Sequence, residues 1–249
     1  MSGHSKWHSI KHKKGAADKA RGKLFAVLIR QIEVAARAGG GDPESNATLR
    51  TTVQKARDNS VPMDTIQRAI KRGTGEEEGV VYEPVSYEGY APSGVAVIVQ
   101  ALTDNRNRTS AEIKNIISRN GGSFAEPGAV SWQFERKGIV VVDRAVDEDE
   151  LTLAAADAGA DDVQDVGDAW HVTTPPTELH AVRTAMEEAG IAVKSSDLTM
   201  IPTTTVALDT EATAKSVLRL MDSLEDHDDV EAVYANFDIP DAVLEAVSA

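Results

Sequence analysis

The chain has 249 residues, of which 41% are hydrophobic and 27% charged, and it contains no cysteine. This length is enough for two or three domains, and the lack of thiols excludes a disulfide framework, thiolate metal sites and a cysteine nucleophile. The net charge of −14 hides an asymmetry. Residues 1–72 hold 15 Lys and Arg against 6 Asp and Glu (+9), whereas residues 73–249 hold 11 against 34 (−23). A basic segment joined to an acidic body favours a polyanion-binding module, with nucleic acid as the polyanion.

The sequence shows no segment typical of membrane insertion. Its apolar runs, such as Val95–Val99, are far shorter than the roughly 20 residues of a membrane-spanning helix. No apolar stretch follows the basic N-terminus at once, so the start is not typical of a signal peptide, with an amphipathic transit peptide as the weaker alternative. We therefore expect a cytoplasmic protein with no membrane partner.

The first 79 residues predict a basic arm followed by a small helical domain. The arm covers residues 1–14, which have no apolar periodicity. Apolar residues then recur at three- and four-residue steps, and the breaks contain glycine or proline, which is typical of amphipathic helices and their ends. The expected helices cover residues 16–38, about 43–57 with Asp42 as the N-cap, and 63–71.

After a linker at residues 76–79 the pattern changes to alternating strands and helices. Residues 138–201 predict the order β-α-β-β-α-β, which is the ferredoxin-like split unit. A strand, a helix and a strand precede this unit, and another such set follows it. The preceding set covers residues 95–102, 109–120 and 130–134, and the following set covers 204–208, 211–224 and 230–237.

Joined together, the two flanking sets would make a second unit of the same kind. We therefore predict an α+β multidomain protein, with an N-terminal three-helix domain followed by two ferredoxin-like α/β domains, one inserted in the other. The predicted domains are residues 1–79, a discontinuous domain of residues 80–134 plus 203–249, and an inserted domain of residues 135–202. Two consecutive α/β domains without nesting are the alternative.

Cations in the arm and the helices are the candidate nucleic-acid contacts. Lys and Arg contact phosphates, and Trp7 can stack on an exposed base. The alternative is a solvated basic tail with Trp7 packed on the helical domain. The predicted nucleic-acid-binding residues are Lys6, Trp7, Lys11, Lys13, Lys14, Lys19, Arg21, Lys23, Arg50, Lys55, Arg57, Arg68, Lys71 and Arg72.

A second anion site is predicted where a strand passes into a helix at residues 103–109. Arg106 and Arg108 stand out there in an acidic region. The positive end of the helix dipole would add to their attraction for a phosphate. An ordinary strand-to-helix turn with Thr109 as the N-cap explains the segment equally well.

No metal, cofactor or catalytic site is predicted. His4, His8 and His12 have helical spacing, but the surrounding cations disfavour a metal ion. No nucleophile, phosphate-loop, dinucleotide or zinc-protease motif is present, so we expect neither an enzyme nor a small-molecule substrate. Two alternatives stay open: a Mg²⁺-dependent hydrolase using Asp161 and Asp165, and a protein-interaction module whose basic head docks on an acidic partner.

Several long strings of this chain resemble the YebC family, over nearly the whole sequence. They cover residues 1–7, 10–12, 22–25, 40–43, 68–75, 87–90 and 101–109. The chain departs from the family pattern at His8, where alanine is expected, and at residues 60–62 and 91–94. The resemblance implies a three-domain cytoplasmic protein with a helical N-terminal domain and two α/β domains.

The resemblance leaves the nucleic acid open. Bacterial members are probable transcriptional regulators that bind DNA, mitochondrial relatives are translational activators of cytochrome c oxidase subunit I, and some bacterial relatives are linked to the ribosome and to translation through proline stretches. We expect a non-enzymatic regulator of gene expression that binds DNA through its basic N-terminal domain. The alternative is an RNA-binding translation factor that uses the same domain on ribosomal RNA or tRNA.

Overall fold

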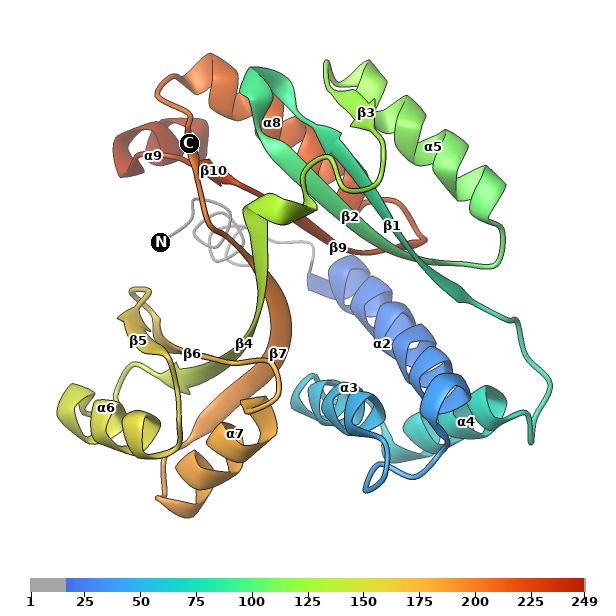
Figure 1. Cartoon of the computed structure of the whole chain (residues 1–249), viewed down its shortest axis with the longest axis vertical. Coiled ribbons are helices and arrows are strands. Elements are labelled where there is room, and N and C mark those ends of the chain that lie inside the picture. Colours follow the sequence, from blue (N-terminus) through green and yellow to red (C-terminus); the bar gives the residue numbers. More distant parts are fainter. Residues whose placement is uncertain (1–16, 249) are drawn as a thin grey trace. The chain divides into compact units, whose positions relative to one another are not determined.

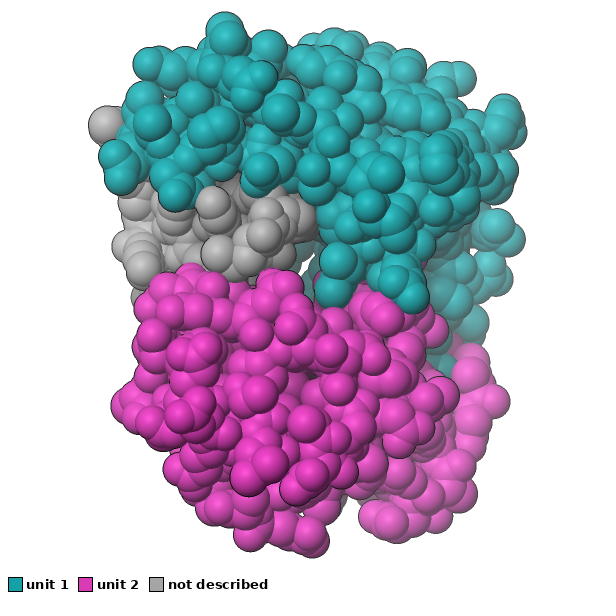
Figure 2. All heavy atoms as spheres, turned by 60° about the vertical axis from the view of Figure 1, so that its left-hand side comes forward, with its two compact units in different colours: residues 1–34, 78–135, 201–249 teal, residues 35–77, 136–200 magenta. Residues whose placement is uncertain are grey.

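The computed structural model describes residues 17–248, and the side chains of residues 21–247 among them. The chain divides into two compact units, shown in teal and magenta in Figure 2. The first unit comprises residues 1–34, 78–135 and 201–249, and the second comprises residues 35–77 and 136–200. A helical region precedes antiparallel sheets along the chain, so the predicted α+β class is confirmed (Figure 1).

The N-terminal helical region follows the predicted apolar periodicity. Its helices are α2 (Ala17–Gly39), α3 (Ala47–Asp58) and α4 (Met63–Thr74). Leu28 and Ile32 of α2 are fully buried, as their spacing predicts. The second helix begins later than expected, because Asn46 and not Asp42 is its N-cap: the Asn46 side chain accepts a hydrogen bond from the Leu49 N–H at 3.0 Å. The Asn46 amide also donates to the Ala35 carbonyl at 2.8 Å, which ties α3 to the end of α2.

The first unit is built on a four-stranded antiparallel sheet with the strand order β3-β1-β2-β9. Its strands are β1 (Glu83–Tyr90), β2 (Ala96–Thr103), β3 (Ser123–Ala125) and β9 (Val230–Ala235). The helices of this unit are α5 (Arg106–Arg119), α8 (Glu211–Glu225) and α9 (Asp241–Ser248). Helices α5 and α8 contact each other, and Val99, Ile113 and Val217 meet in one core.

Several details of the first unit differ from the sequence prediction. Strands β1 and β3 and helix α9 were not expected. The segment predicted as a strand at residues 130–134 is a short 3-10 turn, η2 (Ser131–Gln133). The Glu88 carboxylate accepts the N–H groups of Val130 and Ser131, so these groups cannot donate to a neighbouring strand.

A further difference concerns the strand predicted at residues 204–208. It is shortened to β8 (Val206–Ala207), which pairs in parallel with β10 (Phe237–Asp238) and not with the main sheet. A second 3-10 turn, η1 (Pro92–Gly94), joins β1 to β2.

The second unit contains the predicted β-α-β-β-α-β order. Its strands are β4 (Phe134–Asp143), β5 (Asp162–Asp165), β6 (Ala169–Thr174) and β7 (Val193–Pro202), and its helices are α6 (Glu148–Asp157) and α7 (Leu179–Glu188). The strand order β5-β6-β4-β7 places the first and third strands at the centre, as in a ferredoxin-like sheet. Val140, Leu151, Trp170 and Met186 fill the core between this sheet and its helices.

The chain crosses between the units within α2, within β4 and within β7, and also at residues 77–78. The second unit therefore contains α3 and α4 together with the ferredoxin-like sheet. The three-domain division with boundaries at residues 79, 134 and 202 stays a prediction.

Candidate nucleic-acid interface

Part of the predicted interface falls in the arm. Lys6, Trp7, Lys11, Lys13 and Lys14 lie outside the described residues, as does the side chain of Lys19, and the same holds for the three arm histidines. The other predicted residues are described, and they fall into two groups: cations that already hold other parts of the protein, and cations that face solvent.

Lys23 belongs to the first group. Its ammonium donates hydrogen bonds to the backbone carbonyls of Glu225, the last residue of α8, and, at 2.7 Å, of His227 just beyond it. A cation is favoured there because the carboxyl end of a helix is partly negative. Burial lowers the pKa of Lys23, and the neighbouring charges of Asp226 and Asp228 oppose this shift. Lys23 therefore anchors α2 to α8 within the first unit.

Arg50 and Lys55 hold other parts of the second unit. The Arg50 guanidinium donates to the carbonyls of Pro43 at 3.0 Å and Glu44 at 2.6 Å, so it closes the turn before α3. The Lys55 ammonium is paired with the Asp197 carboxylate of β7. Both side chains are partly buried, and a phosphate would have to compete with these contacts.

The exposed group lies on α3 and α4. Arg57 and Lys71 are exposed, and neither side chain has an ion-pair partner within the described part of the chain. Arg68 is also exposed and pairs with Asp64 one helical turn away at 3.0 Å, a kind of surface pair that contributes little stability. These side chains can contact a polyanion without breaking a buried interaction.

Two further exposed cations lie on α2. Arg37, which the sequence analysis missed, is in the last turn of α2, and its guanidinium lies 3.4 Å from the Arg72 carbonyl at the end of α4. Arg37 is exposed and therefore adds a cation beside the end of α4, the helix that carries Lys71. Arg21 of α2 is exposed as well and lies 5.8 Å from the centre of the Phe25 ring.

The two arginines of the predicted second anion site have different surroundings. Arg108 pairs with Asp229 at 2.7 Å and with Asp104 at 2.9 Å, and its hydrogen bond to Asp229 is the main cause of its raised pKa. Arg106 is exposed and lines an open hollow of about 430 Å³ beside Tyr87 and Ser110, at the first turn of α5. Of these two arginines, Arg106 can therefore bind a phosphate without losing an ion pair.

The carboxylates of Asp229 and Glu112 lie close to His227, and the three could in principle hold a metal ion. The Asp229 N–H donates to His227 Nδ1 at 3.1 Å, so the ring proton sits on Nε2 and faces Glu112 at 2.8 Å. Arg108 and Arg30 approach the same Asp229 carboxylate, at 2.7 and 3.8 Å. Cations already neutralise this cluster, which argues against a metal site here.

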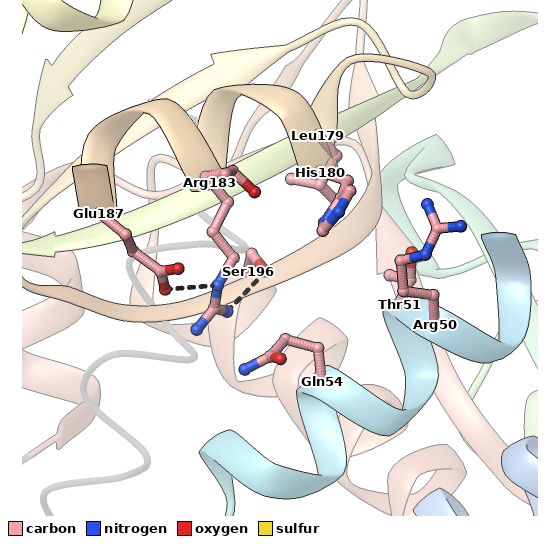
Figure 3. Close-up of a pocket in the computed structure, with 9 residues that line it drawn as sticks. Arg50, Thr51, Gln54, Leu179, His180, Arg183, Glu187 and Ser196 are labelled. Atoms are coloured by element: carbon pink, nitrogen blue, oxygen red, sulfur yellow. Dashed lines mark hydrogen bonds and ion pairs between the residues drawn. The ribbon is translucent and has the colours of Figure 1, made fainter. Parts of the chain in front are cut away.

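A polar hollow between α3 and α7 is the other candidate site of the second unit (Figure 3). Its volume of about 60 Å³ has room for roughly two water molecules. Arg183 of α7 lies on its wall with its guanidinium pointing toward Glu187 and Ser196, each at 2.9 Å. This hollow is too small for a nucleotide.

Arg183 is a buried structural cation that the sequence analysis missed. It makes two hydrogen bonds to the Asp58 carboxylate of α3, at 2.7 and 3.0 Å, and both side chains are 8% exposed. Burial alone would lower the pKa of Arg183, but the charges and hydrogen bonds of Asp58 and Glu187 outweigh it and raise the pKa. In the sequence, the four-residue spacing between Arg183 and Glu187 indicates an ion pair on a helix, but an exposed ion pair has the same spacing, so the spacing does not reveal that Arg183 is buried.

The described helices include none that is long and apolar enough to cross a membrane.

Comparison with known proteins identifies relatives over the whole chain. The domain family described as "TACO1/YebC protein N-terminal domain" matches residues 5–76, and "TACO1/YebC second and third domain" matches residues 82–237. Proteins named "probable transcriptional regulatory protein" from Thermobifida fusca and Halothermothrix orenii are 56% and 54% identical to it, over 100% of this chain and 100% and 99% of theirs.

A solved structure shows the same fold. The crystal structure of a conserved hypothetical protein, Aq1575, from Aquifex aeolicus is 46% identical in sequence, with a TM-score of 0.83 over 90% of this chain and 93% of the other. Family matches that together span most of the residues, and full-length relatives above 50% identity, lead to one conclusion. The chain belongs to the YebC/TACO1 family.

Proposed function

We propose that this protein is a non-enzymatic, cytoplasmic regulator of gene expression that binds DNA through its basic N-terminal region. The observation that carries the proposal is the charge division: residues 1–72 are strongly basic in a chain whose net charge is −14. The described helices of that region leave Arg37, Arg57, Arg68 and Lys71 exposed. The names of the relatives, probable transcriptional regulatory proteins, support a role in transcription.

The binding mode we propose rests on phosphate contacts. Each exposed cation that meets a phosphate releases a counterion, so affinity comes from charge and falls with salt. The acidic body repels phosphate elsewhere and thereby turns the basic region toward the nucleic acid. The arm residues Lys6, Lys11, Lys13 and Lys14 add contacts in this proposal, as does Arg106 at the second anion site.

The alternative is a translation factor that binds RNA on the ribosome with the same basic region. Trp132, an exposed tryptophan on the first unit, favours it, because an aromatic ring can stack on unpaired bases, which structured RNA presents more often than a duplex does. Binding to purified ribosomes in competition with duplex DNA separates the two versions. Ribosomes that displace the DNA at physiological salt support the translation version, and DNA binding that ribosomes do not compete supports the transcriptional one.

The first prediction tests the exposed cations. In the double variant Arg57→Gln/Lys71→Gln, we expect weaker binding to mixed-sequence duplex DNA and a log–log salt slope that is less steep by about 2, one for each lost phosphate contact. Both side chains face solvent, so the thermal unfolding midpoint should not change. Fluorescence anisotropy across a salt series measures the affinity and the slope together.

The matched control is Lys114→Gln/Lys215→Gln, which removes two exposed cations from α5 and α8 of the acidic first unit. We expect this control to keep the wild-type slope. Equal losses of DNA affinity in both double variants would contradict the proposed interface. A wild-type protein that binds no nucleic acid at 50 mM salt would contradict the proposed function itself.

A further inference from the structure

Trp132 is an exposed tryptophan on a firmly held loop. Its side chain is 71% exposed, whereas Trp170 is 2% exposed in the core of the second unit. A tryptophan left in water forgoes the favourable burial of a large apolar surface. Tryptophan is enriched at binding interfaces, because it combines a large apolar ring with a polar N–H, so Trp132 is a candidate contact residue.

The indole ring is held in one orientation by its own loop. The Trp132 Nε1–H donates a hydrogen bond to the Ala129 carbonyl at 3.1 Å, and the Tyr90 hydroxyl donates to the same oxygen at 3.2 Å. The ring therefore presents a fixed apolar face. A ring that is already ordered loses little conformational entropy when a partner stacks on it.

The loop itself is fixed at both ends. The buried Glu88 carboxylate accepts hydrogen bonds from the N–H groups of Gly128 at 2.8 Å, Val130 at 2.6 Å and Ser131 at 3.0 Å. On the other side of the tryptophan, the Gln133 carbonyl accepts from the N–H of Thr203 at 2.8 Å. Every one of these residues belongs to the first unit, so the support of the ring does not depend on the second unit.

The surroundings of the ring fit a nucleobase better than a protein surface. The other large apolar side chains exposed in the described part of the chain are on α4, on α6 and at residues 80–81, none of them in the Trp132 loop. A stable protein interface needs about 800 Å² per partner with an apolar centre. Glu126, Pro127 and Gly128 are the exposed neighbours in the loop. A nucleobase is a flat ring with polar edges, and it can cover an isolated indole without a surrounding apolar patch.

We propose that Trp132 is a stacking platform for an unpaired nucleobase, an inference that rests on the proposed nucleic-acid binding and extends it to a second point on the molecule. The carboxylate of Glu126 disfavours a phosphate in the same loop, so the contact is with the base and not with the backbone. Base stacking at Trp132 therefore adds affinity that depends weakly on salt, beside the salt-dependent affinity of the basic region.

The test compares the wild-type protein with Trp132→Ala and Trp132→Phe. The probes are a 12-nucleotide single-stranded oligouridine, an abasic strand of the same length, and a duplex. For oligouridine we expect Trp132→Ala to lose roughly 5- to 150-fold in affinity, the range of one base–aromatic stack, at an unchanged salt slope. Trp132→Phe should keep most of the affinity, and the abasic strand and the duplex should not distinguish the three proteins.

A second readout follows the indole directly. In a Trp7→Phe background, oligouridine should quench the fluorescence of Trp132, and the quenching should vanish in Trp132→Phe, because the remaining Trp170 is buried. Wild-type affinity of Trp132→Ala for oligouridine, with the salt-dependent binding intact, overturns the stacking site and leaves the proposed function standing. Failure of the wild-type protein to bind any of the probes overturns both.

Discussion

At the scale of single residues, Glu88 shows how one side chain can fix the backbone of a loop. Three backbone N–H groups converge on its buried carboxylate. Burial alone would raise the pKa of Glu88, but these hydrogen bonds outweigh it and hold the pKa below its ordinary value. The carboxylate accepts two N–H groups that strand pairing would otherwise use, in the loop that carries the exposed Trp132.

The second prediction, after that for the exposed cations, concerns acid stability. Because the pKa of Glu88 is depressed in the folded protein, its contribution is fully present above the ordinary glutamate pKa and is lost as the pH falls from there through the folded value. At pH 7 we expect Glu88→Gln to lower the unfolding free energy by about 1–3 kcal/mol. Toward pH 3 the difference in unfolding free energy between Glu88→Gln and the wild type should become smaller.

Urea unfolding at a series of pH values measures this difference. Glu126→Gln is the control, because Glu126 is exposed in the same loop. A loss from Glu88→Gln that is the same at pH 7 and pH 3 would show that the charge of the carboxylate is not what holds the loop.

At the scale of elements, the sequence predicts helices better than the contacts between them. Apolar periodicity correctly predicted α2, α4 and the β-α-β-β-α-β order, because helix and strand periodicity are local patterns of the sequence. It missed β1, whose sequence includes Pro84, Ser86 and Gly89, and which is a strand because β2 and β3 pair with it on both sides. A side chain at Gly89 would meet the Ser123 carbonyl at 2.8 Å, so the close approach of β3 requires glycine there.

The same limit applies to the candidate site. The sequence shows in which segment Lys and Arg are concentrated, but not which of these side chains already form ion pairs or hydrogen bonds within the protein. Lys23, Lys55 and Arg108 meet partners more than 100 positions away in sequence. No local pattern reports such distant pairs. The exposed Trp132 was missed for a related reason, because the loop that carries it is held by Glu88, which is distant in sequence.

The third prediction concerns the contact between α3 and α7. Replacing Arg183 with Met leaves the Asp58 carboxylate buried without its cation, so we expect the unfolding free energy to fall by about 3–5 kcal/mol. Lys194→Met removes an exposed cation that pairs with Asp143 at 2.9 Å in the same unit, and should cost no more than about 1 kcal/mol.

Chemical denaturation of the two variants compares these losses. The double variant Asp58→Leu/Arg183→Met should regain much of the stability, since it leaves no buried charge unpaired. Similar small losses from Arg183→Met and Lys194→Met would mean that Asp58 finds another partner or water, and that α3 is not held to α7 by this pair.

At the scale of the whole molecule, the protein combines a basic start with an acidic remainder, while its compact units do not follow that division. The basic helices α3 and α4 share a unit with the ferredoxin-like sheet, and most of α2 belongs to the other unit. The exposed cations of α3 and α4 therefore lie on one unit and the proposed stacking site on the other. Nucleic acid bound at both would connect the units through a partner as well as through the chain.

The pairing of β2 with β9 has a consequence for the order of folding during synthesis. Val97 lies opposite Ala235 in this pair, so β2 leaves the ribosome long before its neighbour. The second unit, complete by residue 200, can close its sheet in the meantime. Until residues 230–235 emerge, β2 keeps an unpaired edge rich in valine and isoleucine, which makes this interval the time when the nascent protein is most exposed to wrong pairing with other chains.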